Sequence, residues 1–371
     1  MKKQSVKTFQ SILTLAILII AVSCQKNMND NAANAKGGDS GDISPKDFKN
    51  FVQVDLVGNA APARYSDANL VNGWGITFPP SGPAWVSSEG KGVSTIYNLD
   101  GVTVASAVSI PYAGTSSNGH PTGHVYNPTA DFKLPNGNAA QFIFATTDGT
   151  ISGWNSGNAA VKKVDRSPSA SYLGITMANV GSEFFLYVAN FAQNRIDVFD
   201  KNWNPVVKPF ADPNMPADYS PFNIQTVSDG KLYVTYAKKN AAGQAVAGPG
   251  NGYINVFSPD GTLLTRFASK GKLDAPWGIT KAPPGFWGEW SQIPNLILVA
   301  NNGDGRINVF DENGNFLAPV STKGKAIEID GLWGITFPPM TGLNRYYMYF
   351  AAGPNDGSGG LVGYIKNGYI N

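Results

Sequence analysis

The sequence predicts an all-β fold, a six-bladed β-propeller whose ring is closed by an N-terminal strand. The main observation is a recurring apolar segment, which reads Trp-Gly-Ile-Thr-Phe at residues 74–78 and again at 333–337. Residues 277–280 repeat Trp-Gly-Ile-Thr, and weaker copies lie near Gly123, Leu173 and Phe222. A spacing of about 50 residues is typical of four-stranded propeller blades.

Composition supports the same fold class. The chain has 42 glycines, 12% aromatic residues and only 15% charged residues, which suits many short strands joined by turns. No long segment carries the apolar period of an amphipathic helix, and the repeats run on without a linker. The formal net charge of +2 provides no basic stripe, so we expect no nucleic-acid partner, and we expect a monomer.

Each repeat contains four predicted strands. The recurring segment is the first, an apolar run is the second, and a polar turn separates it from an alternating third strand, clearest at 195–199, 253–257 and 306–310. The fourth is clearest at 263–267. In the first strand we expect the Trp and Ile to point to one side, with Trp74, Trp277 and Trp333 wedged between blades.

Ring closure follows from the two ends of the repeat array. The last unit stops after its third strand, whereas residues 51–57 precede the first unit and have no unit of their own. We therefore expect residues 51–57 to form the outer strand of the last blade, which protects the sheet edges. Five and seven blades are the alternatives.

The N-terminus has the pattern of an export signal. Lys2 and Lys3 precede an apolar run at 11–22, and the only cysteine, Cys24, follows Ser23. This predicts a lipoprotein signal peptide at 1–23, a lipid anchor on Cys24, a flexible tether at 24–48 and one propeller domain at 49–371. The expected location is the outer membrane or cell surface. The alternative is an ordinary signal peptide and a periplasmic or secreted protein.

Several motifs are more specific than the repeat, which itself resembles the NHL repeat. They lie at 121–123, 142–155, 221–225, 331–334 and 353–357. Together they resemble an uncharacterised bacterial family of exported β-propellers, some of which carry a C-terminal PEP-CTERM sorting signal. The sequence ends at Asn371 without that signal, so we expect Cys24 to provide the anchor. The resemblance implies fold and export but no particular reaction.

The connections between strands two and three, and those between blades, are expected on one face. We interpret this face as a binding surface. Its candidate residues are Asn72, His124, Asp148, Asn223, Asp304 and Asp356. His124 and Asn223 are chosen because they stand where weaker copies should carry the glycine. The competing interpretation is that these Asp and Asn residues only form turns.

A resemblance to calcium-dependent lactonases and phosphotriesterases gives an alternative. Calcium requires several oxygen ligands, and the side chains that could approach the axis are Asn72, Asn223, Asp274 and Asp330. Glu89 is expected in a turn, which argues against an axial ligand. His120 and His124 are four residues apart, but without a third ligand we expect a loop residue and a packing residue.

Two further tryptophans, Trp287 and Trp290, lie in a long connection on the opposite face, where they could stack on a sugar or peptide or cap the ring. The sequence contains no serine-hydrolase elbow, phosphate loop or zinc-protease motif. We therefore expect an anchored module that binds a protein or glycan, with no catalytic residue or cofactor assigned. A calcium-dependent hydrolase is the alternative.

Overall fold

The structure is a computed structural model that describes residues 43, 45–60, 62–227, 229–288, 291, 293, 296–339 and 341–369. The described residues lie in one compact unit. Cys24, the predicted signal peptide, most of the predicted tether and Trp290 lie outside them. Within the described residues, no helix is long and apolar enough to cross a membrane.

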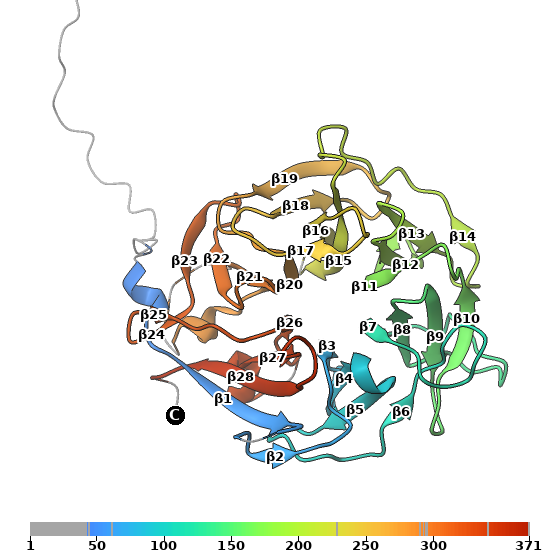
Figure 1. Cartoon of the computed structure of the whole chain (residues 1–371), viewed down its shortest axis with the longest axis horizontal. Helices are drawn as coiled ribbons and strands as arrows, with labels where there is room; N and C mark the ends of the chain where they lie inside the picture. Colours follow the sequence, from blue (N-terminus) through green and yellow to red (C-terminus); the bar gives the residue numbers. More distant parts are fainter. Residues whose placement is uncertain are drawn as a thin grey trace, which may run out of the picture. The chain divides into compact units, whose positions relative to one another are not determined.

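Six antiparallel sheets surround a common centre in the described part of the chain (Figure 1), and they confirm the predicted propeller. The strands of blades 1 to 3 are β3 (Gly73–Thr77), β4 (Ala84–Ser88), β5 (Val93–Tyr97) and β6 (Val108–Ser109); β7 (Pro121–Tyr126), β8 (Phe142–Thr146), β9 (Thr150–Trp154) and β10 (Val161–Asp165); and β11 (Tyr172–Val180), β12 (Glu183–Asn190), β13 (Arg195–Phe199) and β14 (Pro205–Val206).

The strands of blades 4 to 6 are β15 (Tyr219–Val227), β16 (Lys231–Lys239), β18 (Gly252–Phe257) and β19 (Leu263–Ser269); β20 (Pro276–Lys281), β21 (Ile297–Asn301), β22 (Ile307–Phe310) and β23 (Phe316–Pro319); and β26 (Leu332–Thr336), β27 (Met348–Ala352), β28 (Leu361–Asn367) and β1 (Phe51–Gly58). The remaining elements are β2 (Tyr65–Ser66), β17 (Ala245–Val246), β24 (Ser321–Thr322), β25 (Lys325–Ala326), η1 (Pro45–Phe48), η2 (Glu89–Lys91), η3 (Pro284–Trp287) and η4 (Leu343–Tyr346).

The N-terminal strand closes the ring as predicted. β1 pairs antiparallel with β28, from Phe51 opposite Asn367 to Gly58 opposite Leu361. The first strand of the domain thereby becomes the fourth strand of the last blade, and Figure 1 shows the blue and red strands side by side. Closure pairs the edge of β28, which would otherwise expose unpaired backbone groups.

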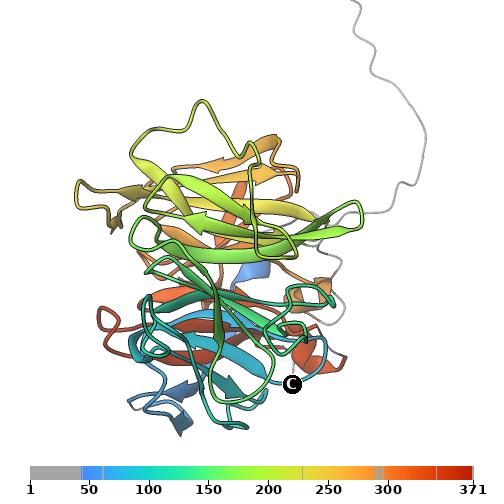
Figure 2. The ribbon, with the colours of Figure 1, turned by 90° about the vertical axis from the view of Figure 1, so that its right-hand side faces the viewer.

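The apolar core is divided among the spaces between blades. Neighbouring sheets pack face against face (Figure 2), and each of the six interfaces holds its own cluster of buried side chains. A seventh cluster lies among the innermost strands. Each blade therefore buries both faces, which explains why the second strands read as nearly continuous apolar runs.

Trp287 belongs to this core. It is 5% exposed, and its ring packs edge-on against Phe48 and Phe51, with centroids 5.2 and 6.0 Å apart. Phe48 ends η1, within the segment expected as a tether, and is itself buried. Of the two uses proposed for Trp287, the structure places it as a cap on the interface between blades 5 and 6 rather than as a surface for stacking a ligand.

Candidate functional site

The tryptophans of the recurring segment meet at the centre of the ring. Trp74 stacks on Trp333 with ring centroids 3.5 Å apart, and Trp277 stands edge-on to both at 6.1 and 6.0 Å. Leu173 and Phe222, which hold the same position in blades 3 and 4, complete this axial cluster with Phe191. The prediction that these tryptophans wedge between blades was therefore wrong.

A β-bulge explains the difference. Every innermost strand shows a register shift at this point, for example between Gly73 and Ile76 in β3. A bulge inserts an extra residue and redirects side chains. The Trp consequently faces the axis, whereas Ile76 faces the space between blades 6 and 1.

The glycine after the Trp allows the innermost strands to approach closely. A Cβ atom on Gly75 would lie 2.8 Å from Thr122 O, and one on Gly334 would lie 2.6 Å from Trp74 O. A Cβ on Gly174 would overlap the side chain of Asn223, which stands at the glycine position of blade 4. Glycine is therefore required by contact with neighbouring backbone, as expected for a crowded axis.

Asn223 has a structural role in this position. It is 1% exposed; its Nδ2 donates to Trp277 O at 2.8 Å, and its Oδ1 accepts from the backbone N–H of Ile224 at 2.8 Å. The side chain thus links the innermost strands of blades 4 and 5 where glycine is lacking. Both its polar atoms are engaged, so it offers little to a ligand.

His124 lies elsewhere than expected. In β7 the glycine position belongs to Gly123, and His124 stands one residue later, opposite Phe144. It is 5% exposed between blades 1 and 2, where Nδ1 lies 2.9 Å from Ser87 Oγ and Nε2 has no partner among the described residues. Burial lowers the pKa of His124 to about 3, because desolvation disfavours the charged imidazolium.

A hydrogen-bonded chain links the axial cluster to the loops on one face. Trp333 Nε1 donates to Asn72 Oδ1 at 3.2 Å, Asn72 Nδ2 donates to Glu89 Oε2 at 2.9 Å, and Glu89 Oε1 lies 2.8 Å from His120 Nδ1. We call these four residues the loop network. Trp74 Nε1, also in the axial cluster, is buried without a hydrogen-bond partner among the described residues.

The order of elements brings the loop network together. Asn72 precedes β3, Glu89 opens η2 after β4, and His120 precedes β7. These connections therefore gather on one side of blades 1 and 2, which we call the loop face. Sequence reasoning expected Glu89 in a turn and His120 in a loop but did not pair them. The sequence could have suggested this pairing, because both residues belong to connections that share a face in adjacent blades.

Most predicted aspartates of the loop face stabilise backbone. Asp148 accepts from Ala113 N at 2.6 Å and from the hydroxyl of Thr146. Asp304 accepts from Arg306 N at 3.1 Å and from Asn301 Nδ2 at 3.0 Å. These contacts agree with the turn-forming interpretation.

Asp356 differs from those two aspartates. It is exposed, with a φ of 53° in the sharp turn after β27. Its carboxylate is therefore accessible on the loop face, but no residue of the loop network contacts it among the interactions of the described residues. Asp356 can therefore serve as a control position on the same face.

The four side chains considered for calcium do not fit a shared axial ion. Asp274 accepts from Gly248 N at 2.6 Å and Asp330 accepts from Asn355 N at 2.7 Å, while Asn72 and Asn223 have the contacts given above. Burial raises the pKa of Asp274, and the charge of Asp304 adds to this effect. Within the described residues, no three His, Cys, Asp or Glu side chains form a metal-binding group. Indole rings fill the axis beside Asn72 and Asn223, so these four side chains form no shared calcium site there.

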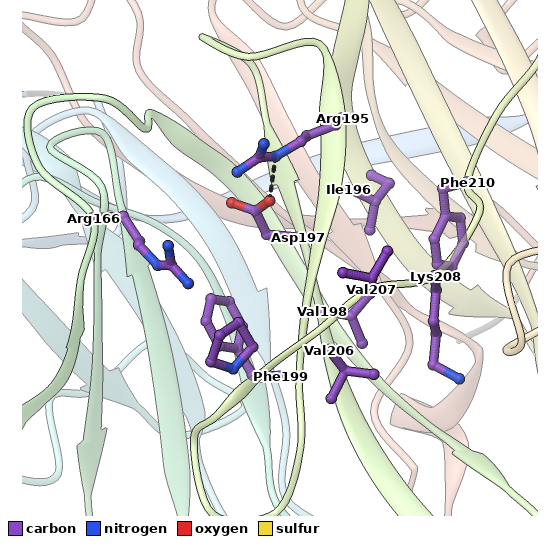
Figure 3. A pocket seen from close by; sticks show the side chains of 11 residues that line it. Arg166, Arg195, Ile196, Asp197, Val198, Phe199, Val206, Val207, Lys208 and Phe210 are labelled. Carbon is purple, nitrogen blue, oxygen red and sulfur yellow. Dashed lines mark hydrogen bonds and ion pairs between the residues drawn. The ribbon is translucent and has the colours of Figure 1, made fainter.

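A separate cavity lies on the outer part of blade 3 (Figure 3). Its volume is about 280 Å³, and Arg166, Arg195 and Lys208 line it together with an apolar wall that includes Val206 and Phe210. Figure 3 shows Arg195 paired with Asp197, whose Oδ1 lies 2.6 Å from Arg195 Nε. No residue of the loop network lines this cavity.

The sequence relatives are viral proteins. Uncharacterized protein R648 of Acanthamoeba polyphaga mimivirus is 34% identical over 324 residues, which cover 82% of this chain and 76% of that protein. Uncharacterized protein L690 of the same virus is 34% identical over 318 residues, 81% of each chain. The chain belongs to their family. These relatives do not support the expected kinship with bacterial PEP-CTERM propellers, and no family model matches the chain.

Solved structures agree on the fold. Virginiamycin B lyase from Staphylococcus aureus matches with a TM-score of 0.52 and 14% identity, covering 85% of this chain and 99% of that chain. The α-L-arabinanase of Penicillium chrysogenum, complexed with arabinobiose, matches with a TM-score of 0.55 and 11% identity, covering 86% and 100%. At these identities the similarity shows the propeller architecture alone, because one fold hosts many activities.

Proposed function

We propose that this protein is a binding module that receives a protein or glycan ligand at the loop network. The main observation in support is the continuous chain of contacts from Trp333 through Asn72 and Glu89 to His120. It joins a half-buried indole at the axis to an imidazole that is 46% exposed. A polar group held in place by other polar groups needs little reordering when a ligand arrives.

The chemistry of the contact defines the ligand group. A carboxylate accepts hydrogen bonds, so Glu89 favours the tautomer in which His120 Nδ1 carries the proton. In the neutral imidazole, Nε2 is then an acceptor. The matching ligand presents a donor, such as a sugar hydroxyl or a peptide N–H.

The test is ligand capture by variants of the loop network. The probes are a glycan array and cross-linking of the purified protein to an envelope extract, with variants His120→Ala and Glu89→Gln. We expect each variant to lose about tenfold or more in affinity, the size of one or two charge-assisted hydrogen bonds. The matched control is Asp356→Asn, which removes a charge from the same face and retains a residue tolerant of positive φ. Equal capture by all three variants, at equal Tm, would refute the proposal.

We further propose that the protein is exported and anchored through a lipid on Cys24, at the outer membrane or cell surface. Support comes from the basic and apolar N-terminal segments and from the position of the chain's only cysteine. In a bacterial host, Cys24→Ala should move the protein from the membrane fraction to the soluble fraction. Retention of the variant in membranes would contradict the lipid anchor.

A further inference from the structure

A second polar and aromatic site lies on blade 2, at the end of the sheet opposite the loop face. β9 starts beside the turn at 146–150 and ends at Trp154, where a cavity of about 210 Å³ opens. Its lining consists of Leu134, Pro135, Asn136, Trp154, Asn155, Ser156, Ala159 and Val161. No charged side chain is among them. The Trp154-Asn155 pair ends one of the sequence motifs, and the proposed function gives it no role.

Trp154, the aromatic wall of this cavity, is restrained by contacts within the protein. Trp154 packs against Trp85 of blade 1, with ring centroids 4.8 Å apart, and its Nε1 donates to Gly157 O at 2.9 Å. The indole N–H is thereby satisfied and the orientation of the ring is restrained before any ligand binds. A restrained aromatic surface loses little conformational entropy on binding.

The opposite wall is a hydrogen-bonded turn. Gly137 N donates to Leu134 O and Leu134 N donates to Asn138 O, both at 2.9 Å. Leu134 is itself buried between blades 2 and 3. This places Asn136 on a turn that is tied to the core, so its amide is held near Trp154 rather than carried by a free loop.

The amides leave a specific pair of groups available. Asn136 Nδ2 donates to Asn155 Oδ1 at 3.1 Å, and Asn155 Nδ2 donates to Asn136 Oδ1 at 3.2 Å and to Ala139 O at 3.1 Å. Asn138 N and Ser156 Oγ donate to the two amide oxygens. Within the described residues this leaves one N–H of Asn136 and the lone pairs of Ser156 Oγ without a partner.

We propose that this cavity binds the terminal residue of a neutral glycan. A sugar ring offers an apolar C–H face for Trp154, and its hydroxyls both accept and donate, which matches Asn136 Nδ2 and Ser156 Oγ. The cavity is smaller than the roughly 300–1,000 Å³ of pockets for drug-sized ligands, which suits one ring. A uronate has no cation to pair with in this lining.

The test is ligand-observed NMR on the whole protein. The probes are the methyl glycosides of glucose, galactose, mannose, N-acetylglucosamine, xylose and arabinose, their disaccharides, and methyl glucuronide as the charged counterpart. We expect at least one neutral glycoside to bind at millimolar concentration, with its disaccharide bound as well through one end. Asn136→Ala should weaken binding about three- to tenfold, the effect of one hydrogen bond. Trp154→Phe should weaken it without loss of fold.

The controls separate this site from others. Asn202→Ala removes an exposed amide from the turn between β13 and β14 of blade 3 and should leave binding unchanged. His120→Ala is measured beside it and reports any part of the sugar signal that comes from the loop network. Binding of no neutral glycoside would overturn the proposal, as would binding that survives both Asn136→Ala and Trp154→Phe. If binding is lost only in His120→Ala, the sugar belongs to the loop face.

Discussion

The interface between blades 1 and 2 differs from the other five at one pair of positions. In the other blades an isoleucine of the innermost strand stands opposite Val or Phe of the second strand, as Ile335 stands opposite Phe350. The register equivalents are Ile76, Ile175, Ile224 and Ile279. Only blade 2 has His124, and only blade 1 places a serine, Ser87, against it.

The residues packed around this position show what changes when histidine stands in place of isoleucine. Ile335 shares its cluster with Ala300, which stands where Ser87 stands in blade 1. The cluster between blades 1 and 2 consists mainly of aromatic and aliphatic residues around Trp85 and Phe142. The ring of His124 stacks on the ring of Phe144, with centroids 5.3 Å apart. At four interfaces the isoleucine faces an alanine, and at the interface between blades 4 and 5 the equivalent position is Thr235. Only the interface between blades 1 and 2 depends on a hydrogen bond to a neutral imidazole at this position.

The largest effect should come from moving the histidine to another interface. Ile335→His would remove a buried aliphatic side chain and place an imidazole against Ala300, which cannot accept or donate through its side chain. We expect a loss of about 3 kcal/mol or more in the free energy of unfolding at neutral pH. Denaturant unfolding measures it. A loss below about 1 kcal/mol would show that Ser87 is not what makes His124 tolerable.

The pH dependence of stability should be specific to His124. Its folded pKa of about 3 lies below the unfolded value of 6.5, so stability is complete above the unfolded value and falls as pH decreases toward the folded value. Between about pH 7.5 and pH 5 the loss amounts to about 2 kcal/mol. The double variant His124→Ile with Ser87→Ala recreates the Ile–Ala pair of four other interfaces and should lack this loss. An equal slope in both proteins would assign the pH dependence to other groups.

A smaller effect should follow from the serine alone. Ser87→Ala would leave Nδ1 of His124 without its partner at 2.9 Å, in addition to Nε2, which has no partner among the described residues. We expect a loss of about 1–2 kcal/mol in the free energy of unfolding at neutral pH. Ala300→Ser in blade 5 is the reciprocal variant for an aliphatic interface. Equal destabilisation by the two variants would remove the distinction between the interfaces.

Calcium should change neither type of interface. The side chains proposed as calcium ligands already form hydrogen bonds to other groups of the protein. The axial cluster packs beside them. We expect the same Tm in excess calcium and in excess chelator. A calcium-dependent rise in Tm would show an ion site that the described contacts do not provide.

Repeat spacing and strand periodicity were sufficient for the architecture. The six copies, the missing last strand and the spare residues 51–57 together implied the closure that β1 and β28 make. The candidate site was predicted less well. The loop face was recognisable from turn residues, but the partnership of Glu89 with His120 depends on two connections that are distant in sequence and adjacent in space.

The sequence by itself determined the number of blades, the ring closure and the need for glycine beside the axis, because repetition and turn chemistry are local properties. Only the tertiary structure decided where the recurring tryptophans point. A bulge in each innermost strand turns Trp74 and its equivalents to the axis and leaves the following Ile or His between blades. Such a shift depends on the pairing partner as well as on the strand's own residues, so strand alternation alone predicted the wrong side.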